Sequence, residues 1–276
     1  MACSIKKVTL SLALGALLGA SNLLADGKLS LVSSGTGDLD NMTLKAHKTI
    51  QEADIVFTMN GEAGKFAELL KGKPIYAAGH ALFSKSTKSK WIKTKDQAGK
   101  EQKKTPEEIA KIEAEYKQLI RKSIKEGKNI VVIDNGDPTI YGPHIYFVKE
   151  FQDLAPKIIP GISSFNAANA ALQTSVIGGL EDAKGVTLTV GSTKNAIIDK
   201  LAPTQSTMVF FMDREFDKFI THLLTLYPKE TPIAIVINAG ESQKEEVIVA
   251  TLATIQAKVG KEKIPFNHLV YVGNFL

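Results

Sequence analysis

Apolar runs of about five residues alternate with amphipathic segments along most of the chain, a pattern typical of strands that alternate with helices. In the first half, the predicted strands are residues 29–33, 53–57, 74–78 and 129–134. The predicted helices between them begin at residues 43, 61 and 106. Repeated alternation of this kind predicts a largely parallel sheet with helices on both faces.

The longest predicted helix has a recognisable start and end. Thr105 is suited to the N-cap, Pro106 to the first turn and Glu108 to the capping-box position. Apolar residues then recur at helical spacing from Ile109 onward, and Gly127 ends the pattern. The segment between Thr105 and Gly127 is therefore predicted to be a single helix.

The second half of the chain repeats the alternation. Its predicted strands are residues 186–190, 207–212, 233–237, 246–250 and 269–272, and its predicted helices are residues 194–201, 214–226 and 251–259. Residues 178–185 are rich in glycine and polar side chains, which is typical of a domain boundary. We therefore predict two α/β domains, over residues 28–180 and 181–276.

Residues 1–25 have the pattern of a secretory signal peptide. Lysines precede an uncharged apolar run over residues 8–20, and Ala25 offers a small residue for cleavage. The run is shorter than the roughly 20 residues of a membrane span, and no twin arginine precedes it. We therefore predict Sec-type export to the periplasm. A cytoplasmic location and an N-terminal membrane anchor are the alternatives.

Composition excludes several classes of protein. The chain has 276 residues, a net charge of +5, 44% hydrophobic residues and 23% charged residues, which excludes disordered, collagen-like and coiled-coil proteins. Its single cysteine is Cys3, within the predicted signal. One thiol cannot build a disulfide framework, a zinc ribbon or an iron–sulfur site.

The positive charge is concentrated in one segment. Residues 85–104 contain eight lysines against Asp96 and Glu101, with Trp91 in the middle. Two interpretations stay open: a flap over a cleft, where lysines attract carboxylates and Trp91 stacks on a ring, or a solvated flexible loop. A nucleic-acid surface is not predicted, because no interleaved aromatic set continues the segment.

The five histidines are scattered, and no pair of them has metal-ligand spacing on one helix. No metal site held by the protein alone is therefore predicted. His80 and His144 each follow a predicted strand. Either could ligate the iron of a haem-like ring, and an ordinary polar role at the surface or in the core is the alternative.

Ligands of open parallel sheets bind beyond the carboxyl ends of the strands, so loops that directly follow strands are the candidate sites. The informative loops are residues 34–38, 134–142, 160–166, 210–213 and 237–241. Glycines in the first two permit a close backbone approach to a ligand, and serines in the third can cap a helix and contact an anion. The alternative for each loop is a tight turn or a capped helix start. The first loop matches neither the dinucleotide fingerprint nor a Walker A loop.

Taken in order, these loops resemble the tetrapyrrole (corrin/porphyrin) methylase family, which uses S-adenosylmethionine. The matching segments are VSSGTGD (32–38), MTLKA (42–46), EADIV (52–56), GDPTIYG (136–142), PGISS (160–164), VFFM (209–212), NA (238–239) and VIVATL (247–252). The resemblance covers residues 29–273, nearly all of the chain that follows the predicted signal. No single motif is specific, but their ordered combination is.

The resemblance implies a mostly parallel sheet in the N-terminal domain, a mixed sheet in the C-terminal domain and S-adenosylmethionine bound in the cleft between them. By motif match, the cofactor-binding residues are Thr36, Asn135, Gly136, Asp137, Ile140, Ser163, Ser164, Met212 and Ala239. The implied activity is methyl transfer to a tetrapyrrole or similar small molecule. The protein has to hold the activated methyl in line with a ring carbon and exclude water. The family also suggests a homodimer.

The chain departs from the family pattern in one place that bears on the chemistry. Thr58 and Met59 stand where uroporphyrinogen-type members carry Tyr-Asp, and a methionine cannot exchange protons. Asp38 is left as the candidate catalytic acid or base. S-adenosylmethionine is made in the cytoplasm, so an export signal leaves a second hypothesis open. That hypothesis is an exported, non-catalytic protein that binds a tetrapyrrole or another small ligand on the same fold.

Overall fold

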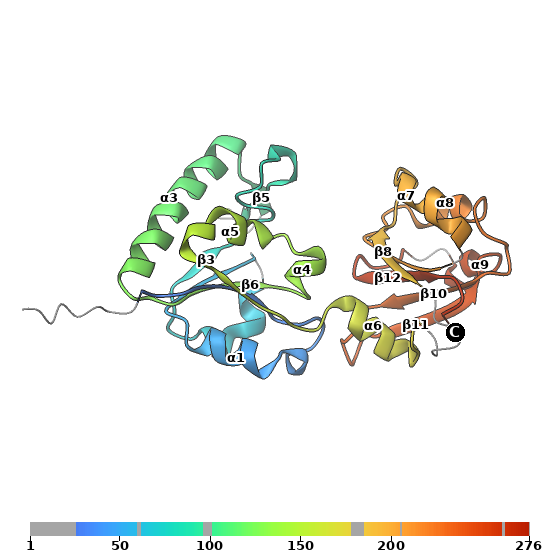
Figure 1. Ribbon diagram of the computed structural model, residues 1–276, viewed down its shortest axis with the longest axis horizontal. Coiled ribbons are helices and arrows are strands. Elements are labelled where there is room, and N and C mark those ends of the chain that lie inside the picture. Colours follow the sequence, from blue (N-terminus) through green and yellow to red (C-terminus); the bar gives the residue numbers. More distant parts are fainter. Residues whose placement is uncertain are drawn as a thin grey trace, which may run out of the picture.

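The computed structural model describes residues 26–59, 62–95, 101–177, 185–204, 206–260 and 263–275, which form two lobes (Figure 1). The predicted signal peptide and residues 178–184 of the predicted boundary lie outside these residues. Among the residues described, no helix has the length and apolar character needed to cross a bilayer.

The first lobe is built on a five-stranded sheet in the order β3-β2-β6-β1-β7, and every pairing in it is parallel. Its strands are β1 (Leu29–Ser33), β2 (Ile55–Thr58), β3 (Ile75–Ala77), β6 (Ile130–Asp134) and β7 (Lys157–Ile159). Each of the central strands is buried along its whole length, as expected of a parallel sheet covered on both faces.

Helices cover both faces of this sheet, as the alternation predicts. The helices of this lobe are α1 (Leu44–Gln51), α2 (Ala67–Leu70), α3 (Pro106–Lys125), α4 (Pro138–Tyr141) and α5 (Ile145–Glu150). Ile50 of α1 and Leu70 of α2 pack with Val56 on one face. Ile120 of α3 and Phe147 of α5 pack on the other.

The predicted start of α3 is confirmed in atomic detail. The Thr105 hydroxyl accepts a hydrogen bond from the Glu108 N–H at 3.2 Å, and the Glu108 carboxylate accepts one from the Thr105 N–H at 2.8 Å. This reciprocal capping box satisfies two backbone donors that the first helical turn leaves without an intrahelical partner.

The second lobe carries a mixed sheet in the order β11-β10-β12-β9-β8, which confirms the predicted sheet types of both domains. Its strands are β8 (Val186–Val190), β9 (Thr207–Phe211), β10 (Pro232–Ile237), β11 (Glu246–Thr251) and β12 (His268–Val272). Strands β8 and β9 pair in parallel, whereas the other pairings are antiparallel. The helices α7 (Ala196–Leu201), α8 (Phe216–Leu223) and α9 (Ile255–Val259) pack on one face.

Helix α6 (Ser164–Leu172) covers the other face of the second sheet. Its Ala168 is fully buried with Val209, and the Tyr271 hydroxyl donates a hydrogen bond to the Asn169 side chain at 2.8 Å. The predicted boundary assigns this helix to the N-terminal domain. By packing it belongs with the second sheet, and Figure 1 shows it beneath that sheet, beside the junction of the lobes.

The lysine-rich segment contains a hairpin that its polar sequence does not predict. Strands β4 (Lys93–Lys95) and β5 (Glu101–Lys103) pair in antiparallel fashion. The segment before them is tied to α3, because Glu113 accepts a hydrogen bond from the Phe83 N–H at 2.6 Å and pairs with Lys90 at 2.8 Å. The remaining short elements are 3-10 helices at Leu39–Asn41, Ala63–Phe66, Thr87–Ser89, Gln152–Leu154 and Ala202–Thr204.

Candidate functional site

The loops that follow β1 and β6 are joined at the carboxyl edge of the first sheet. The Gly136 N–H donates to the Gly35 carbonyl at 2.9 Å, and the Ser34 N–H donates to the Asp134 carbonyl at 2.8 Å. The Ser33 hydroxyl donates to the Gly136 carbonyl. Both glycines have a positive φ, near 70°, which other residues adopt only with strain. The glycines therefore allow the two loops to meet backbone to backbone.

The loop after β7 packs against the end of β1, beside the two glycine loops. An ideal Cβ on Gly161 would lie 2.0 Å from the Ser33 Oγ, so only glycine fits there. Two residues on, the buried Ser163 hydroxyl caps α6 by accepting a hydrogen bond from the Asn166 N–H at 3.3 Å. Ser164 is the first residue of that helix. Three predicted loops thus converge on one edge of the sheet.

The second lobe touches this edge through the loop after β10. The Gly240 carbonyl accepts hydrogen bonds from the Asp38 N–H at 2.8 Å and from the Asn41 side chain at 3.0 Å. The same Asn41 amide also donates to the Thr36 carbonyl at 3.0 Å. The backbones approach so closely that a Cβ on Gly37 would lie 2.0 Å from the Gly240 oxygen.

The carboxylate of Asp38, the predicted acid or base, forms hydrogen bonds in this contact between the lobes. Its Oδ2 accepts hydrogen bonds from the Ser242 hydroxyl at 2.6 Å and from the Ser242 N–H at 2.9 Å. The hydroxyl first, and then the backbone N–H, lowers the pKa of the Asp38 carboxyl below its usual value. Asp38 is therefore held ionised as a clasp between the two lobes.

The apolar part of the predicted site is also assembled. Ile140, Met212 and Ala239 belong to one apolar cluster, although they come from three different loops. Met212 and Asn238, which follow β9 and β10, have φ values of 56° and 50°. Left-handed backbone at residues other than glycine is strained and concentrates at functional sites. Two strained strand ends thus lie at the edge of the second sheet that carries Met212 and Ala239.

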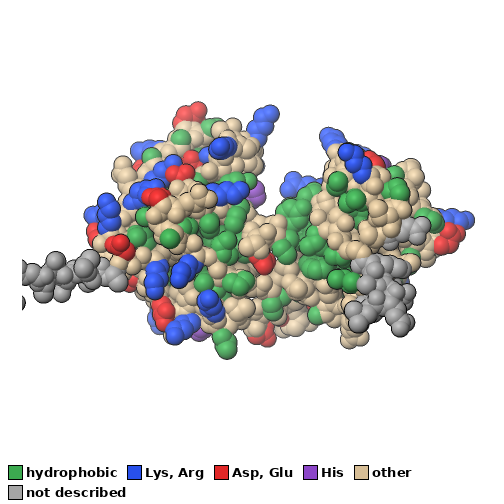
Figure 2. Space-filling model, in the orientation of Figure 1, with side chains coloured by type: hydrophobic (Ala, Val, Ile, Leu, Met, Phe, Trp, Pro, Cys, Tyr) green, Lys and Arg blue, Asp and Glu red, His purple; other side chains and the backbone are tan. Residues whose placement is uncertain are grey.

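Space is left beside the loop after β6. A Cβ on Gly136 would meet nothing within 4 Å, and Asn135 is exposed. The Asp137 carboxylate accepts hydrogen bonds from the Thr139 N–H at 2.8 Å and from the Thr139 hydroxyl at 2.6 Å, so it caps α4. A hollow opens between the lobes, and its wall on the second lobe is largely hydrophobic (Figure 2). A ligand there would meet the loop after β6 on one side and apolar side chains on the other.

A buried ion pair supports the loop after β6. Asp134 and His144 are each about 1% exposed, and the His144 Nδ1 lies 3.3 Å from the Asp134 Oδ1. The His144 Nε2 lies 3.0 Å from the Ala78 carbonyl. Burial alone lowers the pKa of the His144 ring. The neighbouring Asp134 carboxylate, the Ala78 carbonyl and the charge of Glu62 outweigh this effect, so the pKa of His144 is raised.

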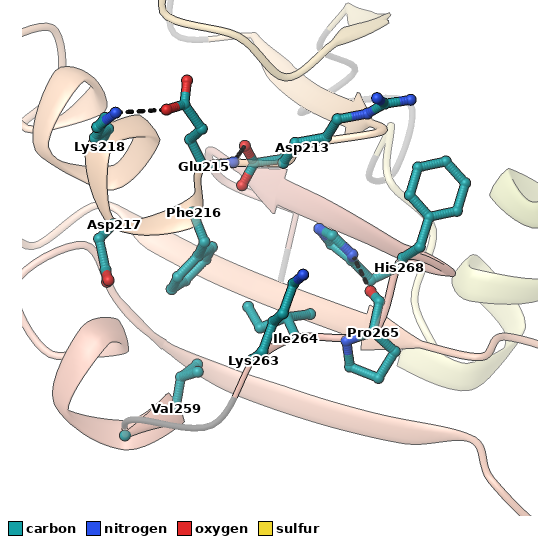
Figure 3. Close-up of a pocket in the computed structure, with 13 residues that line it drawn as sticks. Asp213, Glu215, Phe216, Asp217, Lys218, Val259, Lys263, Ile264, Pro265 and His268 are labelled. Atoms are coloured by element: carbon teal, nitrogen blue, oxygen red, sulfur yellow. Dashed lines mark hydrogen bonds and ion pairs between the residues drawn. The ribbon is translucent and has the colours of Figure 1, made fainter.

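A second hollow, of about 870 Å³, lies in the second lobe between the start of α8 and residues 259–260, 263–266 and 268. Asp213 and His268 are both buried in its wall (Figure 3). The His268 Nδ1 lies 2.6 Å from the Pro265 carbonyl. Burial raises the pKa of Asp213. None of the predicted cofactor-binding residues lines this hollow, so it is separate from the site between the lobes.

The sequence predicts the loops of the site but not all the residues that hold them together. The structure adds Ser33, Asn41, Asp134 and Ser242. Asn41 and Ser242 join segments about 200 positions apart, and no local motif marks them. Asp134 carries a usable signal, because a charged residue that ends a buried strand needs a partner.

Comparison with known proteins identifies what this arrangement is similar to. The family model of the tetrapyrrole (corrin/porphyrin) methylases matches residues 28–256. A cobalt-precorrin-4 C(11)-methyltransferase from Methanocaldococcus jannaschii is 30% identical over 265 residues, with 90% of this chain and 88% of that protein covered. A siroheme synthase from Psychrobacter arcticus is 26% identical over 90% of this chain, which spans only 42% of the length of that relative.

Solved structures share the fold. The cobalt-precorrin-4 methyltransferase CbiF superposes with a TM-score of 0.68 at 19% sequence identity, covering 92% of this chain and 98% of that one. The uroporphyrin-III C-methyltransferase of Thermus thermophilus, solved in complex with S-adenosylhomocysteine, gives a TM-score of 0.59 at 21% identity, covering 90% and 98%. At these identities the likeness concerns the fold.

Proposed function

The chain belongs to the tetrapyrrole (corrin/porphyrin) methylase family, and from this premise we propose that it transfers a methyl group from S-adenosylmethionine to a tetrapyrrole or related ring. One observation carries the proposal. The two glycine loops of the first sheet and the strained strand ends of the second approach the same hollow, as a cofactor bound between the lobes requires.

The residues present fit this cofactor. The open space beside Gly136 suits the amino-acid end of the molecule, while Met212 and Ala239 offer apolar surface to the adenosine. When bound, S-adenosylmethionine supplies a sulfonium methyl that needs no further activation. The protein holds the donor and the acceptor ring in line and, through the contact between Gly37 and Gly240, keeps the lobes closed against water.

Binding of the cofactor is the direct test. We expect S-adenosylhomocysteine and S-adenosylmethionine to bind the purified protein with one site per chain in isothermal titration calorimetry. Adenosine alone should bind more weakly, because it cannot reach the backbone groups at residues 135–137. If neither sulfur compound binds at millimolar concentration, methyl transfer is refuted and the hypothesis of a non-catalytic ligand-binding protein gains support.

The role of Asp38 can be separated from catalysis by a pair of variants. Asp38→Ala removes both hydrogen bonds to Ser242 and should weaken S-adenosylhomocysteine binding by about fivefold, whereas Ser242→Ala removes only the hydroxyl bond, keeps the backbone N–H and should weaken binding less. The double variant should bind no more weakly than Asp38→Ala alone, because the two residues act through one contact. A catalytic base would behave differently: Asp38→Ala would abolish turnover while cofactor affinity stayed unchanged.

We also propose that the protein is exported and that residues 1–25 are removed. The basic start, the short apolar run and the small residue at position 25 support this proposal. Cell fractionation followed by N-terminal sequencing should find a chain that begins at Asp26 in the periplasmic fraction. A chain that begins at Met1 in the cytosolic fraction would refute export. It would also remove the main reason to consider a non-catalytic binding protein.

We further propose a homodimer, which membership of the family supports. Light scattering of the purified protein should then give about twice the mass of one processed chain, independent of concentration over the micromolar range. A mass equal to that of one chain would refute the dimer.

A further inference from the structure

The proposed cofactor site leaves one end of the first sheet unused. The cofactor loops follow β1, β6 and β7, whereas β2 and β3 lie beyond β6 in the order β3-β2-β6-β1-β7. Neighbouring strands are about 4.8 Å apart, so the end of β3 lies roughly 10 Å from the end of β6. A ring that receives a methyl from a donor at β6 therefore has the ends of β2 and β3 on which to rest.

The segment that follows β3 forms a firm wall there. This Trp91 wall comprises residues 79–93. The His80 N–H donates to the Trp91 carbonyl at 2.8 Å, the Trp91 N–H donates back at 3.2 Å, and the two rings stack with centroids 5.4 Å apart and planes within 7°. A Cβ on Gly79 would lie 2.2 Å from the buried Ile92 side chain, so the wall is packed tightly against the core.

The hydrogen bonding of His80 defines which ring nitrogen is available. Its Nδ1 lies 2.8 Å from the Ser89 carbonyl, which can only accept, so Nδ1 carries the proton. In the neutral ring the lone pair is then on Nε2, which has no hydrogen-bond partner among the described residues. The ring itself is half-buried. Histidines that ligate metals have this arrangement: one ring nitrogen donates to a backbone carbonyl, and the other offers its lone pair to the metal.

Any metal that met this nitrogen would have to bring its other ligands. Within the described ranges there is no group of three or more His, Cys, Asp or Glu side chains that could hold an ion. A metal chelated by a tetrapyrrole meets the requirement, because the ring nitrogens occupy the equatorial positions and leave an axial one open.

The charge of the wall suits the edge of such a ring. Residues 79–93 carry four lysines and no acidic residue. One of them, Lys90, is paired with Glu113, while Lys85 and Lys88 are exposed. The Lys93 ammonium lies 5.6 Å from the centroid of the Trp91 ring. A macrocycle with several peripheral carboxylates would be attracted to this surface, and a neutral one would not.

We propose that the Nε2 of His80 is the axial ligand of a metal ion held by the tetrapyrrole substrate, so that the protein selects metal-bearing, carboxylate-rich rings over metal-free ones. The inference rests on the proposed function for the identity of the ring. Coordination would also fix the height and tilt of the macrocycle against the Trp91 wall. Methyl transfer needs such a fixed position, because the accepting carbon must stay in line with the donor.

The test uses cobalt(II) uroporphyrin and metal-free uroporphyrin as probes. Under anaerobic conditions, the electron paramagnetic resonance spectrum of the cobalt(II) probe should gain a triplet splitting from one axial nitrogen when the protein binds it. The cobalt probe should bind at least about tenfold more tightly than the metal-free ring. In His80→Phe, which keeps a ring against Trp91 but has no nitrogen, the triplet should vanish and the two probes should bind alike.

Controls separate ligation from structure. His47→Phe changes an exposed histidine on α1, far from the wall in sequence, and should retain the triplet. Free imidazole should restore a triplet to His80→Gly. A triplet that persists in His80→Phe, or equal affinity of the wild type for both probes, overturns the inference. Binding of S-adenosylhomocysteine is measured in parallel: a triplet without cofactor binding supports His80 ligation and refutes methyl transfer, whereas cofactor binding without a triplet does the reverse.

Discussion

Replacing Asp134 with alanine should lower the free energy of unfolding by about 3–5 kcal/mol, because removing one partner of a buried ion pair leaves the other uncompensated. The Asp134 carboxylate is the ion-pair partner of the buried His144 ring. It also accepts a hydrogen bond from the backbone N–H of His144. Chemical denaturation followed by tryptophan fluorescence measures the effect. The single tryptophan, Trp91, lies in the first lobe, so it reports on the lobe that carries the pair.

The pH dependence of this stability gives a second readout with a definite sign. In the wild type the pKa of His144 is raised, so its contribution is complete below the unfolded value of about 6.5 and is lost as the pH rises through the folded value. In Asp134→Ala the burial of the ring dominates and lowers its pKa, so the His144 contribution to stability should rise with pH instead. The matched control Asp153→Ala removes an exposed carboxylate paired with Arg121 and should leave the unfolding midpoint nearly unchanged. Equal losses in Asp134→Ala and Asp153→Ala would contradict this account of the pair.

The strands of both sheets are predictable because burial leaves a local signature. Strands β1 and β8 begin and end at the predicted residues. Strand β1 is buried along its whole length, while β8 is half-buried at the edge of its sheet and alternates apolar residues with threonine. The hairpin of β4 and β5 leaves no such signature, because the sequences of both strands are polar. A strand is predicted here from its apolar residues, so a strand pair made of polar residues is missed.

The placement of α6 shows a different limit. Its small and apolar residues predict a helix that packs on a sheet, and Ser163 marks where it starts. They do not say which sheet. The helix follows the last strand of the first lobe in sequence, yet its Ala168 packs with Val209 of the second. Its position in the sequence places the helix in the N-terminal domain, whereas its packing places it with the second lobe.

In the candidate site, too, local features are predictable from the sequence and contacts between distant segments are not. Glycine and proline mark the loops around Gly35, Gly136 and Gly161, because backbone conformation and close approach restrict the residue type at each place. The role of Asp38 is set by a partner 204 positions away, so its neighbours in the sequence cannot reveal it. An acidic residue in a ligand-binding loop predicts a catalytic acid or base. Only the position of Ser242 shows that Asp38 instead joins the two lobes.

Substituting Gly37 with alanine should weaken S-adenosylhomocysteine binding by at least about 100-fold, equivalent to about 2.7 kcal/mol. The new Cβ would lie 2.0 Å from the oxygen and 2.1 Å from the carbon of the Gly240 carbonyl, and backbone atoms cannot rotate aside as a long side chain can. Relief requires the lobes to part, which separates Thr36 on one wall of the proposed cofactor site from Ala239 on the other. Calorimetry measures the loss directly.

Gly72→Ala is the matched control for this substitution. Gly72 has a φ of 75°, close to the 73° of Gly37, but a Cβ there would meet nothing within 4 Å. Alanine there carries the cost of a left-handed backbone, about 1–2 kcal/mol of stability, without any clash between the lobes. Gly72→Ala should bind S-adenosylhomocysteine like the wild type. If Gly37→Ala also binds normally, the contact between Gly37 and Gly240 does not close the site. If both variants lose binding alike, backbone strain rather than separation of the lobes explains the effect.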